Sequence, residues 1–237
     1  QLGGPTAGTR GRLLARGFSP SMLHLLPDSL EVSRFSGVDR AQARARVRAE
    51  LGIADAETVV GTLCRLEPVK NLSQLIEAVP PPPVRLLIAR EGSQRTRLQA
   101  EIEQRGLTGK VLLVGNRADA PAVLAALDLF VLSSHSETFG MAVAEALLME
   151  TPAVATRVGG IPDITGDGAY ACLVPPGDPA ALRTAIVATL ADLATAQAKA
   201  RQGQAFVRQA FASEVVAEQL HGFYAQASSS FKILSES

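Results

Sequence analysis

Two glutamates, Glu137 and Glu145, lie eight positions apart where a strand-like run gives way to a helix-like run. Glu137 falls in the loop after the apolar run 127–132, and Glu145 falls about one and a half turns into a helix predicted over 139–149. Apolar residues surround Glu145 in the sequence, so we expect a buried carboxylate, which needs hydrogen-bond partners. The hydroxyls of a vicinal diol, such as that of a ribose, are suitable partners. Taken alone, the pair is equally consistent with the absence of a site, with Glu137 as a solvated loop residue and Glu145 as a surface residue.

The predicted start of this helix offers hydrogen-bond donors. Backbone N–H groups near Phe139, Gly140 and Met141 have no partner within the helix, and they suit an anion such as a phosphate. Gly140 lets a ligand approach the backbone closely because it has no side chain. The stretch from Glu137 to Glu145 therefore predicts a site for a ligand with both phosphate and hydroxyl groups.

Two cations, Arg65 and Lys70, flank a turn that contains Pro68, directly after the strand-like run 58–63. Lysine is rare in this chain, so a lysine within a motif is more informative than usual. Arginine offers a planar fork of donors and lysine a point charge, and together they could clamp a diphosphate. The alternative for these two residues alone is ordinary surface charge.

Gly159 and Gly160 follow another strand-like run and precede a proline-containing turn of helix. Two glycines at this position allow close approach of a ligand to the backbone, although a plain tight turn explains them equally well. The sequence contains no G-x-G-x-x-G dinucleotide fingerprint and no P-loop.

These candidate residues follow strands in an alternating series of strands and helices. Strands are predicted at 58–63, 84–89, 110–114, 127–132, 152–156 and 171–174. They are short, apolar on both faces and rich in β-branched residues, which is typical of a parallel sheet with helices on both sides. The predicted fold class is therefore α/β, a Rossmann-like doubly wound parallel sheet of about six strands. Such sheets bind ligands at the carboxyl ends of their strands.

Composition narrows the functional classes. The 237 residues carry a formal net charge of zero, whereas a nucleic-acid-binding protein would show a basic excess. Cys64 and Cys172 lie in apolar runs and are predicted to be small buried side chains, and no metal-ligand spacing occurs. No run approaches the roughly 18 apolar residues of a membrane span. A cytoplasmic location is the default expectation.

Taken together and in this order, the motifs resemble the carboxy-terminal, donor-binding domain of retaining GT-B glycosyltransferases of family 4. The resemblance covers about residues 22–226. It rests on the segment from Gly61 to Lys70, the pair Glu137 and Glu145, the run 152–162 and the segment 173–178. One departure is Arg90-Glu91-Gly92-Ser93, where the family usually has Gly-Asp-Gly-Pro.

The resemblance implies a role for each matching residue. Arg65 and Lys70 would bind the diphosphate of a nucleoside-diphosphate sugar and stabilise the charge of the leaving group. Glu137 would contact the donor sugar and Glu145 the ribose. The backbone at Phe139, Gly140 and Met141 would hold sugar and phosphate, with Gly159 and Gly160 as further donor-binding positions. Asn116 and Arg117 would lie near the base.

The resemblance also implies the reaction and its partners. The sugar would pass to an unidentified sugar, lipid or small-molecule acceptor with retention of configuration, without a metal ion or other cofactor. Residues 1–26 would be a remnant of a preceding domain and a linker, residues 27–226 the nucleotide-sugar-binding domain, and residues 227–237 a flexible tail. The acceptor site would lie in the preceding amino-terminal domain, which could also contact a membrane peripherally. Without that domain, we expect poor turnover.

Two alternatives stay open at this point. One is a non-catalytic nucleotide-sugar-binding or partner module derived from a glycosyltransferase. The other is a different GT-B enzyme, either a nucleotide-sugar epimerase or a phosphorylase. The spacing of Glu137 and Glu145 argues against an epimerase, and the lack of a pyridoxal-type lysine site argues against a phosphorylase.

Overall fold

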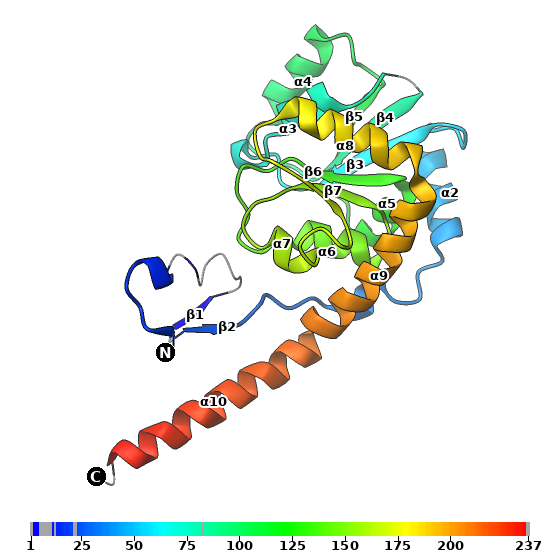
Figure 1. The fold of residues 1–237 in the computed structure, drawn as a ribbon. Helices are drawn as coiled ribbons and strands as arrows, with labels where there is room; N and C mark the ends of the chain where they lie inside the picture. The colour runs from blue at the N-terminus through cyan, green and yellow to red at the C-terminus, as the bar shows by residue number, and fades with distance from the viewer. Residues whose placement is uncertain (1, 5–10, 12, 21–22, 82, 236–237) are drawn as a thin grey trace.

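The computed structural model describes residues 2–4, 11, 13–20, 23–81 and 83–235. A parallel sheet of six strands, in the order β5-β4-β3-β6-β7-β8, forms the centre of the fold (Figure 1). The strands are β3 (Thr58–Leu63), β4 (Val84–Ala89), β5 (Val111–Gly115), β6 (Leu129–Leu132), β7 (Ala153–Thr156) and β8 (Cys172–Val174). The predicted α/β fold class and the six predicted strands are confirmed, with some strand ends shifted by one or two residues.

Helices cover both faces of this sheet (Figure 1). On one face α3 packs against α4 and α8, and on the other α6 packs against α5 and α9, with α2 lying on α5. Their bounds are α2 (Arg40–Glu50), α3 (Leu72–Ala78), α4 (Arg95–Gln104), α5 (Ala120–Ala126), α6 (Met141–Leu148), α7 (Ile161–Ile164), α8 (Pro179–Ala191) and α9 (Leu193–Phe211). Two short 3-10 helices, η2 (Val32–Phe35) and η3 (Pro68–Lys70), lie in the connecting segments.

The strand order reverses direction between β3 and β6. From β3 the chain builds outward through β4 to β5, returns through α5 to β6, and then builds outward on the other side through β7 to β8. Connections that leave two neighbouring strands in opposite directions open a crevice at their carboxyl ends, where ligands bind in sheets of this kind. The fold therefore places the loops after β3 and β6 beside each other.

The two central strands are close-packed. Leu129 and Phe130 of β6 are completely buried, as are Val59 and Val60 of β3. Gly61 leaves room for its neighbours, because a Cβ atom there would lie only 2.5 Å from Cδ2 of Leu127. The apolar character of the strands on both faces follows from burial under helices on both sides.

A buried ion pair joins α2 to the amino ends of the central strands. The guanidinium of Arg48, whose exposed fraction is 1%, donates to Asp128 at 2.7 Å and to the carbonyl of Glu57 at 2.9 Å. The same carboxylate accepts the backbone N–H of Val59 at 2.7 Å. Because the charges are paired and hydrogen-bonded, the burial of Arg48 is tolerated.

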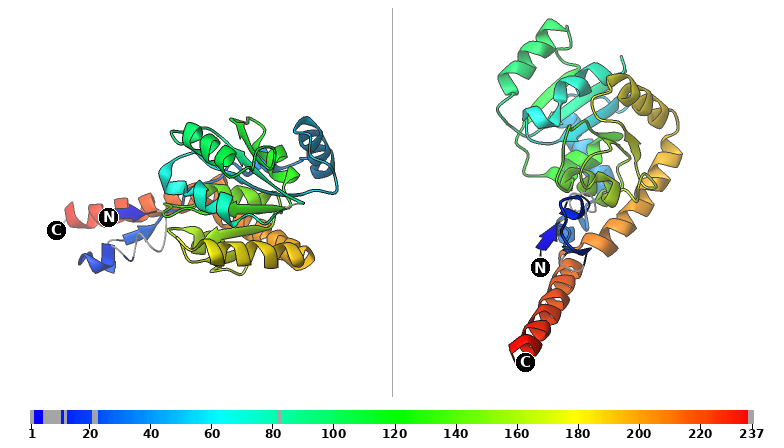
Figure 2. Two further views of the ribbon diagram at one scale, coloured as in Figure 1. Left: turned by 90° about the horizontal axis from the view of Figure 1, so that it is seen from above. Right: turned by 60° about the vertical axis from the view of Figure 1, so that its left-hand side comes forward.

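Two segments extend beyond this body. Strands β1 (Leu2–Gly4) and β2 (Leu23–Leu25) form a separate parallel pair. Helix α10 (Ser213–Ser235) projects away from the sheet (Figures 1 and 2). Within the described residues, no helix combines the length and the apolar character that crossing a membrane requires.

Residues 227–235 belong to helix α10, and the flexibility of this end of the chain stays a prediction. One expectation differs from the structure. Cys172 is exposed, whereas Cys64 is buried, because Cys172 begins β8 at the edge of the sheet. The predicted domain division after residue 26 stays a prediction.

Candidate functional site

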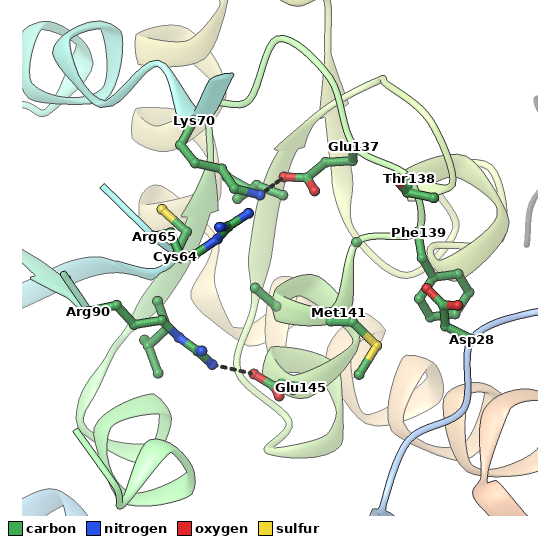
Figure 3. Close-up of a pocket in the computed structure, with 14 residues that line it drawn as sticks. Asp28, Cys64, Arg65, Lys70, Arg90, Glu137, Thr138, Phe139, Met141 and Glu145 are labelled. Carbon is green, nitrogen blue, oxygen red and sulfur yellow. Dashed lines mark hydrogen bonds and ion pairs between the residues drawn. The ribbon is translucent and has the colours of Figure 1, made fainter. Parts of the chain in front are cut away.

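A pocket of about 310 Å³ opens at the carboxyl ends of β3 and β6 (Figure 3). This switch-point pocket lies where the strand order reverses, and its size is at the lower end of small-molecule sites. Seven of the predicted site residues line it, namely Arg65, Lys70, Glu137, Phe139, Gly140, Met141 and Glu145. The topology therefore brings the basic pair, Arg65 and Lys70, next to the two glutamates, although the two motifs lie far apart in the sequence.

One side of the switch-point pocket carries a short ion pair. The ammonium of Lys70 donates to Oε1 of Glu137 at 2.6 Å, and the hydroxyl of Ser134 donates to the same oxygen at 2.6 Å. Both charged side chains are largely buried, with exposed fractions of 17% and 11%. Among the described residues no hydrogen bond reaches the second oxygen of Glu137, which leaves it for a ligand. Arg65 adds a positive charge beside the pair (Figure 3).

Backbone contacts fix the loops that carry this ion pair. The hydroxyl of Ser133 donates to the carbonyl of Lys70 at 2.9 Å, and the N–H of His135 donates to the carbonyl of Val69 at 2.8 Å. Because these bonds join the loop after β3 to the loop after β6, Lys70 and Glu137 are positioned before any ligand binds. Such pre-organisation reduces the entropic cost of binding.

Glu145 lies on α6 at the other side of the pocket. Its exposed fraction is 8%, and its Oε2 atom lies 4.0 Å from a guanidinium nitrogen of Arg90 (Figure 3). Burial raises the pKa of Glu145 above its ordinary value, and the positive charges of Arg90 and Arg34 partly oppose that rise. The predicted burial of this carboxylate is confirmed. A buried carboxylate with so distant a partner can accept hydrogen bonds from a ligand.

The amino end of α6 lies between these two sides. The helix begins at Met141, two residues later than predicted, because Gly140 takes φ of 113° and cannot belong to the helix. A Cβ atom at Gly140 would lie 2.3 Å from Cδ1 of Ile161. Phe139 is buried and stacks edge-on against Phe211 at 5.2 Å. Gly140, Met141 and Ala142 line the pocket, so the amino end of α6 lies at its wall, and the N–H groups there that have no partner within the helix suit an anion.

Gly159 and Gly160 do not line the switch-point pocket. Gly159 has φ of 54°, and a Cβ atom there would lie 1.7 Å from the carbonyl oxygen of Glu137. Gly160 caps the short helix α7. The structure gives Gly159 a supporting position behind the Glu137 loop, while direct contact of these two glycines with a donor stays a prediction.

Asn116 and Arg117 also lie outside the residues that line the pocket. Arg117 is held by two carboxylates, with Glu50 accepting at 2.9 Å and Asp119 accepting at 2.9 Å. The bonds to Glu50 and Asp119 raise the pKa of Arg117. The bonds that Asp119 accepts from Arg117 and Arg46 lower the pKa of Asp119 to about 2. The guanidinium of Arg117 is therefore already hydrogen-bonded to Glu50 and Asp119. Contact of Asn116 or Arg117 with a base stays a prediction.

The structure adds residues to the pocket that the sequence analysis did not select. Asp28, Cys64 and Arg90 line it together with Thr138 and Ala142. Burial raises the pKa of the Cys64 thiol to about 11, so this group is neutral. Arg90 could have been found from its position directly after a predicted strand, the same signal that singled out Arg65.

Comparison with known families identifies the chain. A family model described as glycosyl transferases group 1 matches residues 43–205, more than half of the chain. The chain belongs to the group 1 glycosyltransferases. It is 32% identical over 218 residues to a D-inositol 3-phosphate glycosyltransferase of Segniliparus rotundus, a match that covers 86% of this chain and 47% of that relative. The chain thus spans about half the length of this curated relative.

Solved structures of other glycosyltransferases share the fold of this group 1 chain. The crystal structure of Anabaena HepE in complex with UDP-glucose matches with a TM-score of 0.86 at 25% identity, covering 94% of this chain and 63% of that one. The carboxy-terminal domain of the group 1 protein LpcC from Francisella tularensis matches with a TM-score of 0.66 at 22% identity, covering 78% of this chain and 99% of that domain. These matches agree with a Rossmann-like half of a GT-B architecture.

Proposed function

We propose that this chain is the donor-binding, carboxy-terminal domain of a retaining GT-B glycosyltransferase of the family 4 type. The observation that carries the proposal is the chemistry of the switch-point pocket. Cations lie at one side, a buried carboxylate lies at the other, and a helix amino end lies between them. A nucleoside-diphosphate sugar has a matching order of groups, with a diol at the ribose and negative charge at the diphosphate. HepE, which shares the fold, was crystallised with UDP-glucose.

In this proposal, each side of the pocket binds a different part of the donor. Glu145 accepts hydrogen bonds from the ribose diol, which satisfies a carboxylate that burial otherwise leaves poorly partnered. Arg65, Lys70 and the first N–H groups of α6 bind the diphosphate. The free oxygen of Glu137 contacts hydroxyls of the sugar.

The same cations would promote departure of the nucleoside diphosphate. Negative charge develops on the leaving phosphate as the glycosidic bond breaks, and fixed positive groups in a partly buried site stabilise that charge. Lys70 and Arg65 supply this stabilisation without a metal ion or other cofactor. Glu137 is a sugar-binding residue in this proposal, and no nucleophilic role is assigned to it. Its Oε1 accepts from Lys70 and Ser134, which fixes the carboxylate in place.

Transfer itself would require an acceptor, and we assign the acceptor site to a separate amino-terminal domain. The curated relative is about twice as long as the segment that this chain matches. We therefore expect the chain alone to bind a nucleotide but to transfer sugar poorly. We also propose that the enzyme acts in the cytoplasm, with any membrane contact made through the other domain.

Titration calorimetry with UDP, GDP and ADP tests the proposal. We expect one of them to bind, and we expect Lys70→Ala and Glu145→Gln each to weaken that binding roughly 10-fold or more, as loss of a charged hydrogen-bond partner does. Lys110→Ala and Glu77→Gln are matched controls, because both residues are exposed and lie outside the pocket. The proposal fails if none of the three nucleotides binds at millimolar concentration, or if the pocket variants bind as well as the controls.

A further inference from the structure

Arg90 has an unusual backbone conformation for its residue type. It directly follows β4 and takes φ of 97°, whereas the other non-glycine residues with positive φ in the described part of the chain lie between 49° and 55°. Those values belong to the left-handed helical region, which side chains tolerate at moderate cost, but 97° lies beyond it. Strained conformations of this kind persist only where the surroundings impose them, and they gather at functional sites.

The surroundings of Arg90 do impose this conformation. Its N–H donates to the carbonyl of Gly115 at 2.7 Å, and the carbonyl of Glu91 accepts the N–H of Leu66 at 3.0 Å. Two residues further on, a Cβ atom at Gly92 would lie 2.5 Å from the carbonyl oxygen of Leu66. The turn after β4 is thus held against the loop after β3, and it directs the side chain of Arg90 into the switch-point pocket (Figure 3).

The guanidinium of Arg90 has donors to spare. Its only ion pair within the described residues is with Glu145, and at 4.0 Å the contact is longer than a hydrogen bond. The side chain is 45% exposed, in contrast to the carboxylate it faces. A planar guanidinium in this position can donate to hydroxyl or carbonyl oxygens and can stack on a planar ring.

We propose that Arg90 is a nucleoside-recognition residue, which contacts the ribose and base of the nucleotide while Glu145 holds the ribose diol. This inference rests on the proposed function, because it assumes that the Glu145 side of the pocket receives the nucleoside. It separates the pocket into two sets of cations. Arg65 and Lys70 recognise phosphate, and Arg90 recognises the nucleoside.

The opposite reading is that Arg90 blocks the pocket by pairing with Glu145. The two readings predict changes of opposite sign when the side chain is removed. A blocking residue would make Arg90→Gly bind nucleotides more tightly, whereas a recognition residue would make it bind more weakly. Glycine is the informative replacement because it accepts φ of 97° without strain.

The test compares ligands that contain or lack the nucleoside. We would measure the binding of UDP, UMP and inorganic pyrophosphate by calorimetry. GDP and GMP, and ADP and AMP, would be measured in the same way. We expect Arg90→Gly to weaken the diphosphate and the monophosphate by the same factor, roughly 10-fold, and to leave pyrophosphate unchanged. Arg90→Lys should not restore binding, since an ammonium lacks the planar fork. Lys70→Ala should instead weaken pyrophosphate and UDP more than UMP.

Arg90→Gly should raise the melting temperature while it weakens binding, because it removes strain together with the ligand contact. Glu150→Gly is the matched control, since Glu150 has φ of 52° and lies outside the pocket. It should leave nucleotide binding unchanged.

The outcomes separate this inference from the proposed function. If Arg90→Gly binds UDP and UMP as tightly as the unmodified chain or more tightly, while Lys70→Ala still loses UDP, the role of Arg90 is overturned and the donor site stands. If no nucleotide binds to the unmodified chain, the proposed function fails and the role of Arg90 fails with it. Equal weakening of pyrophosphate by Arg90→Gly would also overturn the role, because it would show a general effect on the charge of the pocket.

Discussion

The two ion pairs of the switch-point pocket differ in how complete they are. Lys70 and Glu137 meet at 2.6 Å, with Ser134 as a third partner, on loops that backbone hydrogen bonds tie together. Arg90 and Glu145 are 4.0 Å apart, and Glu145 is buried on α6 while Arg90 is half-exposed on a strained turn. The first pair is satisfied without a ligand. The second leaves a desolvated carboxylate and a guanidinium that both lack close partners.

This difference indicates that the first pair positions the site and that the second is free to contact a ligand. A completed pair fixes the geometry of a site, because breaking it would leave a partly buried charge alone. An incomplete pair can gain hydrogen bonds when a ligand arrives, and that gain contributes to affinity. We therefore expect changes near Glu137 to affect the stability of the fold more than changes near Glu145, and the following experiments test this expectation.

The largest effect is expected from Gly159→Ala, behind the Glu137 loop. The added Cβ atom would lie 1.7 Å from the carbonyl oxygen of Glu137, so the loop must move and the completed pair must be displaced. We expect a loss of about 3 kcal/mol in the free energy of unfolding, measured by urea denaturation, together with loss of nucleotide binding.

Gly52→Ala is the matched control for this substitution. Gly52 has φ of 63°, close to the 54° of Gly159, but a Cβ atom there meets nothing within 4 Å. It should cost only about 1 kcal/mol, the backbone contribution alone. Equal losses for the two variants would mean that the Glu137 loop does not depend on its contact with Gly159.

An intermediate effect is expected at the completed pair itself. Lys70→Met leaves Glu137 without its cation in a largely buried position, and we expect a loss of about 2 kcal/mol in the free energy of unfolding. The double variant Lys70→Met with Glu137→Gln removes both charges and should recover most of that loss. Nucleotide binding should remain weak in both variants. Recovery of binding along with stability would contradict the role of Lys70 as a phosphate contact.

The smallest change in the free energy of unfolding is expected from Glu145→Gln, which should increase stability near neutral pH where the other substitutions reduce it. Burial raises the pKa of this carboxyl in the folded chain, so the folded state binds its proton more tightly than the unfolded state does. Its contribution to stability is therefore most favourable below the ordinary value of 4.5 and is lost as the pH rises through the higher pKa of the folded chain.

Glu145→Gln removes this dependence on pH. Near neutral pH the variant should be more stable than the unmodified chain, and the difference should shrink as the pH falls toward 4.5, the ordinary value. Urea denaturation across that range measures the difference, with Glu77→Gln as an exposed control. A variant that is less stable at neutral pH would show that Glu145 already has good partners without a ligand.

Much of this architecture could be read from the sequence. Runs of apolar, β-branched residues predicted β3 to β8, and parallel topology then required Arg65, Lys70 and Glu137 to share one edge of the sheet. The burial of Glu145 followed from its apolar neighbours. These inferences succeed because they depend on local pattern and on one general property of parallel sheets.

Other features depend on contacts between distant segments and could not be predicted. Nothing near Gly159 in the sequence shows that its Cα faces the carbonyl of Glu137. The exposure of Cys172 depends on β8 being the edge strand of the main sheet as the described residues form it, which its own apolar run does not reveal. Arg117 looked available to a ligand until the fold brought Glu50 to it from α2. Side-chain availability is thus harder to predict than side-chain location.

The contact between β3 and β6, where the two halves of the sheet meet, has few backbone pairs. Those strands share only two pairs in register, whereas β3 and β4 share six, so the two halves of the sheet are joined by few backbone hydrogen bonds. The switch-point pocket spans this contact at one end, and Asp128 with Arg48 fastens it at the other. Asp128 therefore holds β6 to β3 at the ends of these strands that lie opposite the pocket. We expect Arg48→Met to weaken this link and to change the spacing of the loops that carry the proposed donor site, although the substitution lies a full strand length away.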